Sequence, residues 1–474
     1  MTQLLADIFY ERGPIKTIGV IGMGYVGIPA AALFAQSFNM VYGFQRDSTS
    51  SGYKISLLNS GKNPLKGEEP GLDELIHDIV LNKKFECTSD FSKISFCDAV
   101  TIAIQTPFLN PKDLIPDFSA LEDGIRQVGK FITRGTLVVL ESTITPGTTV
   151  NWALKILEEE SGLKAGKDFG LAHAPERVMV GRLIQNIQEH DRIVGGIDEV
   201  STQRAMELYG PVLTSGKLIP MTATAAEVTK TAENTFRDLQ IAAANQLAFY
   251  CEAMGINFYD VRTGIDSLKG DGITRAILWP GAGVGGHCLT KDTYHLERGV
   301  HIAEHEPVDF PVGVDSLFVT ARNINDFMPR HMFHLMEKGL ARAGKEVKGA
   351  KIALLGWAFL ANTDDARNTP AEPFLELCKA SGADIRVHDP WVTEWPGIDI
   401  SQDLESVLSG ADAVIIFTGH RMYYQLDPHD VRKLSGSLHC VIIDGRNIID
   451  PDVFIQDGFI YKGIGRGDKN SHPV

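Results

Sequence analysis

The sequence predicts an α/β protein in which two Rossmann-like, doubly wound sheets are joined by a long central helix. Three observations predict this fold. Short apolar runs alternate with helical patterns between residues 15 and 200, a second alternation begins near residue 351, and residues 223–254 between them contain neither Gly nor Pro. Alternation of this kind is typical of parallel sheets whose ligand groups lie at the carboxyl ends of the strands.

The expected strands follow from β-rich apolar runs bounded by turn residues. In the first region they are residues 17–21, 39–44, 99–104, 136–140, 169–173 and 192–194. In the second region they are residues 351–355, 384–388, 413–418 and 441–443. Between the two regions, we expect residues 223–254 to form one helix that connects domains and offers a dimer interface, and a further helix from about residue 315 to Pro329.

A Gly-x-Gly-x-x-Gly motif follows the first expected strand. Gly22 permits a tight turn, Gly24 permits close approach of a pyrophosphate, and Gly27 permits close packing of the next helix on the strand, with Tyr25 and Val26 in between. An Ala-rich helix at 29–37 and a second strand complete the unit that this motif requires. The pattern predicts a dinucleotide site.

The end of the second expected strand leaves the choice of dinucleotide open. Gln45 and Arg46 stand where a ribose-binding acid is expected, and Asp47 is the nearest acid. Arg46 suits the 2′-phosphate of NADP, and Asp47 suits a ribose hydroxyl of NAD. A solvated charged turn is the third interpretation. We expect NAD, with NADP as the alternative.

Bulk properties exclude several classes of protein. The net charge of −15 argues against a nucleic-acid partner, and no run of eighteen apolar residues suggests a membrane span. The first twelve residues do not resemble a secretory signal. The six cysteines are scattered without metal-like spacing, so we expect no metal site and a cytoplasmic protein with reduced thiols.

Residues 280–292 contain four glycines that lead into Cys288, and Asp292 follows four positions later. Backbone amides near the start of a following helix favour an anion, including a thiolate. The segment therefore indicates an activated nucleophile, with Asp292 one helical turn away to position water or a proton carrier. The alternative is an ordinary loop that carries a buried cysteine.

Further candidate groups lie at strand ends and on the long helix. The run from Glu141 to Gly147 offers hydroxyls after a strand, although a helix cap explains it equally well. Glu176 follows another strand and suits either water activation or a pair with Arg177. On the helix, Lys230, Asn234 and Arg237, preceded by Glu227, share one face. Lys and Asn suit an oxyanion, whereas the alternative is a solvated charged stripe.

Taken together, these groups favour oxidation of a primary alcohol to an acid. The first hydride removal gives an aldehyde, which loses a second hydride only after a nucleophile adds to it. A thiolate supplies a thiohemiacetal and then a thioester that water cleaves. A one-step hydroxyacid dehydrogenase would need no thiol, and a non-catalytic nucleotide-binding protein would not need all of Cys288, Lys230, Asn234 and Asp292.

Seven motifs spread over nearly the whole chain resemble the UDP-glucose/GDP-mannose dehydrogenase family. They are residues 20–29, 69–72, 141–143, 175–178, 233–238, 283–288 and 444–447. The forms of the 233–238 and 285–288 segments favour an N-acetylated hexosamine over UDP-glucose. The resemblance implies oxidation of UDP-N-acetylmannosamine to its uronate with two NAD, with UDP-N-acetylglucosamine or UDP-glucose as alternatives. Family members form dimers or higher assemblies through the central helix, so we expect a homodimer or larger homo-oligomer.

The resemblance also implies roles for individual residues. Cys288 would be the nucleophile, Lys230 and Asn234 would stabilise the oxyanion, and Asp292, Thr143 and Glu176 would support proton transfer, water and hydrolysis. Residues near the cofactor would be Gly22, Gly24, Tyr25, Val26, Gly27, Arg46, Asp47, Thr106, Glu141 and Arg367. Residues that contact the nucleotide sugar would be Arg177, Val178, Lys230, Asn234, Arg237, Arg275, Gly285 and Arg446.

Three domains are expected on the same basis: residues 1–205 for NAD, a central helical and catalytic domain at 206–325, and residues 326–474 for the UDP-sugar. The sequence departs from the family pattern at three places. Gln45 replaces the strand-end acid, Gln105 stands before Thr106 where Pro is usual, and residues 358–362 lack the lysines common there.

Overall fold

The computed structural model describes residues 2–65, 69–110, 113–179, 181–268, 277–302, 316–437 and 439–470, with the side chains of residues 2, 3 and 301 left out. The chain divides into two compact units. The first comprises Met1–Glu233 with Tyr294–Asp309, and the second comprises Asn234–Thr293 with Phe310–Val474.

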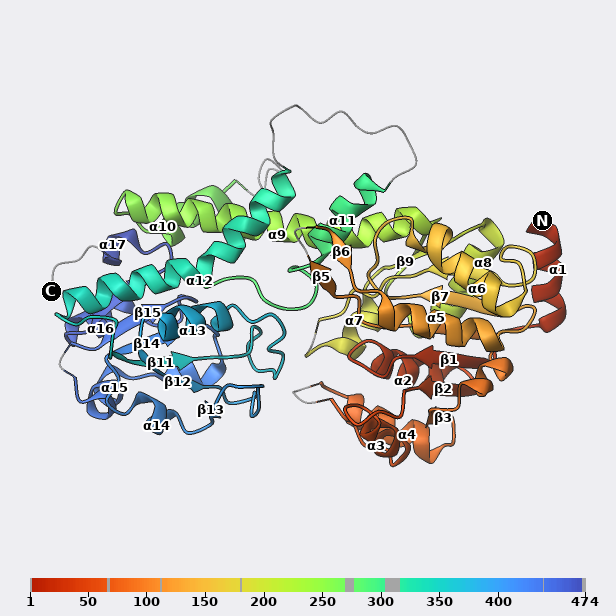
Figure 1. Ribbon diagram of the computed structural model, residues 1–474, viewed down its shortest axis with the longest axis horizontal. Coiled ribbons are helices and arrows are strands. Elements are labelled where there is room, and N and C mark those ends of the chain that lie inside the picture. Colours follow the sequence, from red (N-terminus) through yellow and green to blue (C-terminus); the bar gives the residue numbers. More distant parts are fainter. Residues whose placement is uncertain are drawn as a thin grey trace. The chain divides into compact units, whose positions relative to one another are not determined.

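The first unit contains an eight-stranded sheet in the order β10-β9-β8-β7-β4-β1-β2-β3 (Figure 1). Its strands are β1 (Thr17–Ile21), β2 (Met40–Phe44), β3 (Phe85–Thr88), β4 (Ala99–Ile102), β7 (Leu137–Leu140), β8 (Gly170–His173), β9 (Arg192–Gly196) and β10 (Leu218–Thr222). The six expected strands are present, and β3 and β10 are additional. Both additional strands lie at the edges of the sheet, and β10 contains Pro220, which disfavours a strand assignment from sequence.

One pair in this sheet departs from the expected parallel arrangement. β8 and β9 are antiparallel, whereas every other neighbouring pair in the sheet is parallel. The segment between them, which includes α7 (Leu183–Glu189), does not cross the sheet, so β9 begins at the end where β8 finishes. A buried strand has the same apolar sequence in either direction, so the sequence does not reveal this reversal.

Helices cover both faces of the first sheet. The side chains of α2 (Gly27–Ser37), α4 (Leu72–Leu81) and α8 (Glu199–Tyr209) share a core with one face of the strands. Those of α5 (Ser119–Phe131) and α6 (Leu154–Ser161) share a second core with the other face. The strands are apolar on both sides because both sides are covered, which confirms the doubly wound fold.

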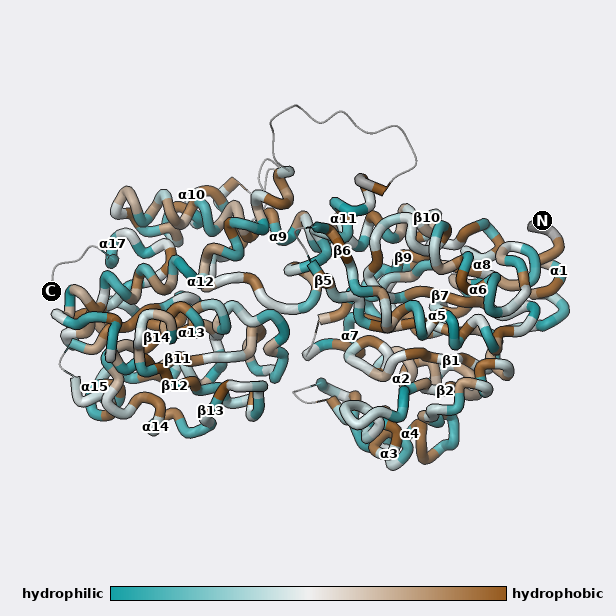
Figure 2. The backbone as a smooth tube through the Cα atoms, viewed as in Figure 1, coloured by the Kyte–Doolittle hydropathy of each residue, from teal (hydrophilic) through white to brown (hydrophobic). Residues whose placement is uncertain are grey.

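The second unit contains a six-stranded, wholly parallel sheet in the order β13-β12-β11-β14-β15-β16. Its strands are β11 (Lys351–Leu355), β12 (Asp384–His388), β13 (Ile400–Ser401), β14 (Ala413–Ile416), β15 (Val441–Asp444) and β16 (Ile460–Gly463). Figure 2 shows the hydrophobic colour along β11 and β14 at its centre. The four expected strands are present, and the edge strands β13 and β16 are additional.

Helices also cover both faces of this second sheet. One face packs against α12 (Leu317–Arg342) and α13 (Ala371–Ala380), and the other against α14 (Leu404–Leu408), α15 (Pro428–Ser435) and α16 (Pro451–Gln456). The expectation of two doubly wound sheets is therefore confirmed. Within the described residues, no helix has the length and apolar character that crossing a bilayer requires.

The long helix α9 (Ala223–Ala253) is close to the expected 223–254. The expectation that the next long helix ends at Pro329 is wrong, because α12 continues through Pro329 to Arg342. Met332, Met336 and Leu340 beyond the proline are fully buried in the core of the second sheet. Burial of these side chains offsets the cost of roughly 3 kcal/mol for a proline in a helix interior.

Candidate functional site

In the first unit, the Gly-rich segment makes a tight turn between β1 and α2. Gly22 has a φ of +98°, and a Cβ there would lie 2.5 Å from the carbonyl oxygen of Ala103. A Cβ at Gly27 would lie 1.9 Å from the carbonyl oxygen of Gly22, whereas one at Gly24 would meet nothing within 4 Å. Tyr25 and Val26 lead into the helix. The open space at Gly24 beside a helix N-terminus fits a dinucleotide pyrophosphate.

Gln45 reaches back to this turn from the end of β2. Its Oε1 accepts a hydrogen bond from the backbone N–H of Met23 at 3.3 Å, and its Nε2 donates to Ser51 Oγ at 2.9 Å. Lys54, from α3 (Tyr53–Asn59), donates to the carbonyl oxygen of Met23 at 2.9 Å, and burial lowers the pKa of its ammonium group. The sequence analysis missed Lys54, because nothing in its spacing separates it from a surface lysine.

Arg46 and Asp47 are both exposed. The Arg46 guanidinium forms an ion pair with Asp123 on α5, and each side chain is about half exposed. These contacts agree with the solvated charged turn that the sequence left open. At this strand end, Gln45 and Lys54 contact the Gly-rich turn through Met23, whereas Arg46 pairs with Asp123.

Loops after β4 and β7 are held together at the carboxyl end of the first sheet. Thr106 Oγ1 donates to the carbonyl oxygen of Thr143 at 2.5 Å, and Ser142 Oγ accepts from the N–H of Ile104 at 2.9 Å. His295 contacts the same region, with Nδ1 3.1 Å from Thr145 Oγ1. Thr106 and Thr143, expected near cofactor and water respectively, are thus neighbours.

Glu141 belongs to a buried ionic cluster. Its Oε1 accepts from Arg192 Nη2 at 2.8 Å and from the Tyr209 hydroxyl at 2.7 Å. Arg192 also pairs with Glu176 and donates to the carbonyl oxygen of Ala174 at 3.0 Å. Burial raises the pKa of Glu141, whose side chain has no exposed surface. Arg192 therefore pairs with both glutamates, and Glu141 is the more deeply buried of the two.

Arg192 and Tyr209 were missed by the sequence analysis. An arginine that begins an apolar strand is the signal that was available, because a buried guanidinium needs carboxylate partners. The alternative in which Glu176 pairs with the Arg177 side chain is not seen. Glu176 Oε1 accepts only the backbone N–H of Arg177 at 2.8 Å, and the Arg177 guanidinium lies 3.6 Å from Glu233. Val178 is half-buried beside them.

On α9, the face that carries the candidate residues changes from buried to exposed. Glu227 is fully buried and accepts hydrogen bonds from the N–H of Gly147 at 2.5 Å and of Thr149 at 2.8 Å. Burial raises the pKa of Glu227 to about 7. Lys230 is buried as well, whereas Arg237 is exposed. A solvated stripe therefore describes only the Arg237 end of this face.

In the second unit, Cys288 is exposed, while the other five cysteines are buried. Its carbonyl oxygen accepts from the N–H of Asp292 at 2.9 Å, where α11 (Asp292–His301) begins. Asn234 Nδ2 donates to Asp292 Oδ2 at 2.5 Å, and Lys291 Nζ lies 3.2 Å from Asp292 Oδ1. The alternative of a buried core cysteine is thus wrong, and two expected catalytic residues, Asn234 and Asp292, are in direct contact.

The glycines before Cys288 pack against the loop that follows β11. A Cβ at Gly285 would lie 2.5 Å from Phe359 Cβ, and one at Gly286, with a φ of +87°, would lie 2.8 Å from the Phe359 ring. Gly286 N–H donates to the carbonyl oxygen of Arg367 at 2.8 Å, and Asn368 Nδ2 donates to that of Gly286 at 3.1 Å. The Arg367 guanidinium itself is held by Asp365 at 2.8 Å.

Arg446 follows β15 and is half-buried. Its Nη1 would lie 3.0 Å from a Cβ at Gly281, and its Nη2 approaches the carbonyl oxygen of Phe359 at 3.5 Å. The backbone N–H of Arg446 donates to Asp444 at 2.9 Å. Arg446 therefore borders both the cysteine loop and the loop after β11. Arg275, also expected to contact substrate, lies outside the described residues.

Three family models match the chain in sequence order. Residues 16–213 match the NAD binding domain of the UDP-glucose/GDP-mannose dehydrogenase family, residues 224–326 its central domain, and residues 353–451 its UDP binding domain. Together these models cover most of the chain, and they place the Gly-rich turn in the first and Cys288 in the second.

Relatives of nearly full length are also found. A crystal structure of NDP-N-acetyl-D-galactosaminuronic acid dehydrogenase from Methanosarcina mazei is 67% identical, covers 99% of both chains and has a TM-score of 0.89. UDP-N-acetyl-D-mannosamine dehydrogenase from Pyrococcus horikoshii is 38% identical over 95% of this chain and 99% of its own. NDP-N-acetyl-D-galactosaminuronic acid dehydrogenase from Ralstonia nicotianae is 31% identical over 91% and 96%, respectively.

Proposed function

Because the chain belongs to the UDP-glucose/GDP-mannose dehydrogenase family, and is thus an NAD-dependent dehydrogenase of nucleotide sugars, we propose that it oxidises C6 of a UDP-N-acetylhexosamine to the carboxylate. The observation that carries the proposal is the cysteine loop. Cys288 is the exposed cysteine of the chain, and it lies one helical turn before an Asp292 that Asn234 contacts directly.

The reaction requires two oxidations at one carbon. NAD, when bound, would supply the hydride acceptor for each of them, so the reaction would use two NAD. The C6 alcohol gives up a proton and a hydride to become an aldehyde. The Cys288 thiolate then forms a C–S bond to that aldehyde, and the resulting thiohemiacetal gives up a second proton and hydride to become a thioester. Water cleaves the C–S bond, which releases the carboxylate and restores the thiol.

Each candidate side chain has a task in this scheme. Lys230 and Asn234 supply a cation and an amide donor to the oxyanion that develops at C6. Asp292, nearly fully buried and bridged to Asn234, serves to orient water and accept a proton. Thr143 and Glu176 assist the water that cleaves the thioester. Arg192 holds the Glu176 carboxylate in one orientation.

The nucleotide sites follow from the same proposal. The turn through Gly22, Gly24 and Gly27, with Tyr25 and Val26, would hold the NAD pyrophosphate, and Gln45 with Lys54 lies at the ribose end of that turn. Thr106 and Arg367 would contact the cofactor, whereas the burial of Glu141 behind Arg192 supports an indirect role for it. The nucleotide sugar would be bound by Arg177, Val178, Arg237, Arg275, Gly285 and Arg446. Residues 1–205, 206–325 and 326–474 are the proposed domains.

Two sugars have separate support. The family resemblance favours UDP-N-acetyl-D-mannosamine, which appears in the name of the P. horikoshii relative. The relative that is 67% identical is named for N-acetyl-D-galactosaminuronic acid. N-acetylmannosamine and N-acetylgalactosamine, the sugar whose oxidation gives that acid, differ in configuration at C2 and C4 but share the acetamido group and the reacting C6 alcohol. An N-acetylated hexosamine is therefore the common substrate class.

Purified protein incubated with NAD and one nucleotide sugar at a time tests the proposal. We expect NADH from UDP-N-acetylmannosamine or UDP-N-acetylgalactosamine, with kcat/KM at least about tenfold above UDP-N-acetylglucosamine and UDP-glucose. Two NADH should form for each sugar consumed. One NADH per sugar, or equal rates with UDP-glucose, would contradict the proposal. Cys288→Ser should stall turnover after partial oxidation or at an ester-like adduct.

The assembly and compartment are further parts of the proposal. Along α9, apolar side chains with exposed surface include Val228, Phe236 and Tyr250, which suits a dimer contact. All six cysteines lie in the described part of the chain and none forms a disulfide, which suits the reducing cytoplasm. Sedimentation of the wild type and of Phe236→Glu tests the contact, since the charge should shift a dimer towards monomer.

A further inference from the structure

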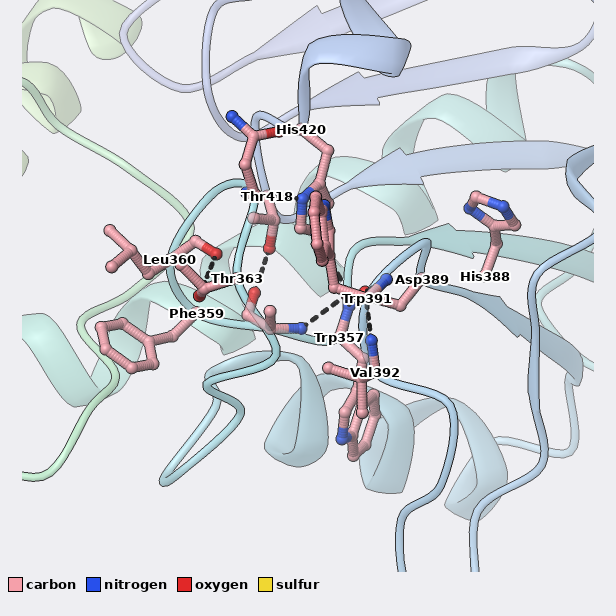
Figure 3. A network of polar contacts seen from close by, with 12 residues as sticks. Trp357, Phe359, Leu360, Thr363, His388, Asp389, Trp391, Val392, Thr418 and His420 are labelled. Atoms are coloured by element: carbon pink, nitrogen blue, oxygen red, sulfur yellow. Dashed lines mark hydrogen bonds and ion pairs between the residues drawn. The ribbon is translucent and has the colours of Figure 1, made fainter. Parts of the chain in front are cut away.

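Asp389 follows β12 and is fully buried in a polar network shown in Figure 3. Its Oδ2 accepts the backbone N–H groups of Trp357 and Ala358 at 2.7 and 2.8 Å. Its Oδ1 accepts those of Trp391 and Val392 at 2.8 and 2.9 Å. Four backbone donors therefore converge on one carboxylate, which fixes the turn after β11 to the loop after β12.

His420 completes this network. Its Nε2 lies 3.2 Å from Asp389 Oδ2, and its Nδ1 accepts the N–H of Asn362 at 2.9 Å. Because Nδ1 accepts, the ring proton is on Nε2, which donates to Asp389. Thr418 adds a hydrogen bond from its hydroxyl to the carbonyl oxygen of Ala358. His420 thus links Asp389 to the loop that begins at Phe359.

The loop held in this way is the one that packs on the cysteine segment. Phe359 is drawn at the edge of the network in Figure 3, with its ring pointing away from Asp389. The same ring lies against Gly285 and Gly286, which precede Cys288 by three and two residues. The carbonyl oxygen of Arg367 accepts the N–H of Gly286. A continuous set of contacts therefore runs from Asp389 through the 357–367 loop to the glycines that precede the nucleophile.

We infer that Asp389 and His420 are positioning residues that set the conformation of the Cys288 loop through Phe359 and Arg367. Only the expected effect on catalysis rests on the proposed function. The geometry of the loop itself is independent of what Cys288 does. Nucleophiles need placement within a fraction of an ångström, and a displacement of 1 Å costs roughly 100-fold in rate.

Two substitutions at His420 separate its two contacts. His420→Gln keeps an N–H donor where Nε2 stands and so keeps the link to Asp389. His420→Asn keeps an acceptor where Nδ1 stands, which preserves the contact with Asn362 and removes the link to Asp389. Tyr423→Phe is the matched control, because it removes the buried hydrogen bond of 2.7 Å to His388 in the same sheet without contacting Asp389.

Cys288 reactivity provides a readout that does not depend on catalysis. Cys288 is exposed and the other five cysteines are buried, so iodoacetamide should label it first. We expect His420→Asn to change the labelling rate about threefold or more and to lower kcat about tenfold, with little change in the KM for NAD. His420→Gln should have a similar effect, because it removes the contact with Asn362. Tyr423→Phe should stay within about twofold of wild type in both measurements.

The outcomes separate the two claims. If His420→Asn alters labelling but Cys288→Ser retains full turnover, the positioning role stands and the proposed function fails. A folded His420→Asn with wild-type labelling and kcat would overturn the positioning role, as would equal losses in His420→Asn and Tyr423→Phe. Should His420→Asn not fold, Phe359→Leu tests the same path, since loss of the ring against Gly286 should change labelling by a similar factor; unchanged labelling overturns the inference.

Discussion

After β1 and after β11 the chain makes the same turn. Gly22 has a φ of +98° and Gly356 a φ of +94°, and each donates its N–H to the last residue of the neighbouring strand, at 3.0 and 2.8 Å. Gln45 and Asp389 stand at the same register, one residue beyond β2 and β12. Each accepts the N–H of the residue after the glycine, Met23 or Trp357.

The two turns differ in what completes them. In the first sheet, the neutral side chain of Gln45 makes one long hydrogen bond to the turn, and the space at Gly24 is open. In the second, the Asp389 carboxylate accepts hydrogen bonds from two backbone N–H groups of the turn, as a phosphate would. One Rossmann-like sheet therefore keeps its first turn available for a dinucleotide, whereas the other has an internal anion there that holds a loop.

The largest expected effect separates these two residues. Asp389→Ala leaves His420 and four backbone N–H groups, three of them in buried hydrogen bonds, without their acceptor. The free energy of unfolding should therefore fall by about 3–5 kcal/mol. Gln45→Ala removes the 3.3 Å bond from Met23 and the 2.9 Å bond to Ser51 at a half-exposed side chain, and it should cost only about 1 kcal/mol. Urea denaturation measures both. Equal losses would show that the two turns do not differ in this way.

The glycines of the first turn should divide into structural and ligand-binding positions. Gly27→Ala places a methyl group 1.9 Å from a backbone oxygen. We therefore expect the free energy of unfolding to fall by about 3 kcal/mol and NAD binding to be lost. Gly24→Ala meets nothing within 4 Å, so the melting temperature should stay unchanged while NAD affinity falls about tenfold. A fluorescence titration with NAD decides; undiminished affinity in Gly24→Ala would place the pyrophosphate elsewhere.

Two buried carboxylates that hold turns should respond differently to pH. Hydrogen bonds from His420 and backbone amides outweigh burial and lower the pKa of Asp389. Its contribution is therefore present above its unfolded pKa of about 4 and is lost only at more acidic pH. Burial dominates at Glu227, whose folded pKa of about 7 exceeds its unfolded value of 4.5.

For Glu227 the folded state binds the extra proton, so stability should fall as pH rises from about 4.5 to 7, by up to about 3 kcal/mol. Glu227→Gln should flatten that part of the pH profile. Melting temperatures of both proteins between pH 5 and 8 provide the measurement. A parallel decline in wild type and variant would assign the pH dependence to other groups.

The smallest effect concerns cofactor choice. Gln45→Asp restores an acid at the end of β2, where it can accept from a ribose hydroxyl and repel a 2′-phosphate. We expect the ratio of kcat/KM for NAD over NADP to rise about fivefold, because Lys54 remains nearby. Gln45→Asn is the neutral control. A fall in the ratio would mean that this strand end does not contact the ribose.

Much of this organisation could be predicted from periodicity and glycine spacing. The central strands of both sheets, the long helix and the loop before Cys288 each have a strong local signal. Arg192, Lys54 and Asp389 were not predicted, because each acts through partners that are distant in sequence. The antiparallel β8–β9 pair and the continuation of α12 past Pro329 depend on tertiary packing, which outweighs local propensity.

The most direct test of the central claim is mass spectrometry of the enzyme quenched in acid during turnover with NAD and the best sugar of the panel. The account predicts a covalent adduct of the nucleotide uronic acid on the peptide that contains Cys288, present in wild type and absent from Cys288→Ala. Full turnover with no adduct on that peptide, or normal turnover by Cys288→Ser, would contradict it.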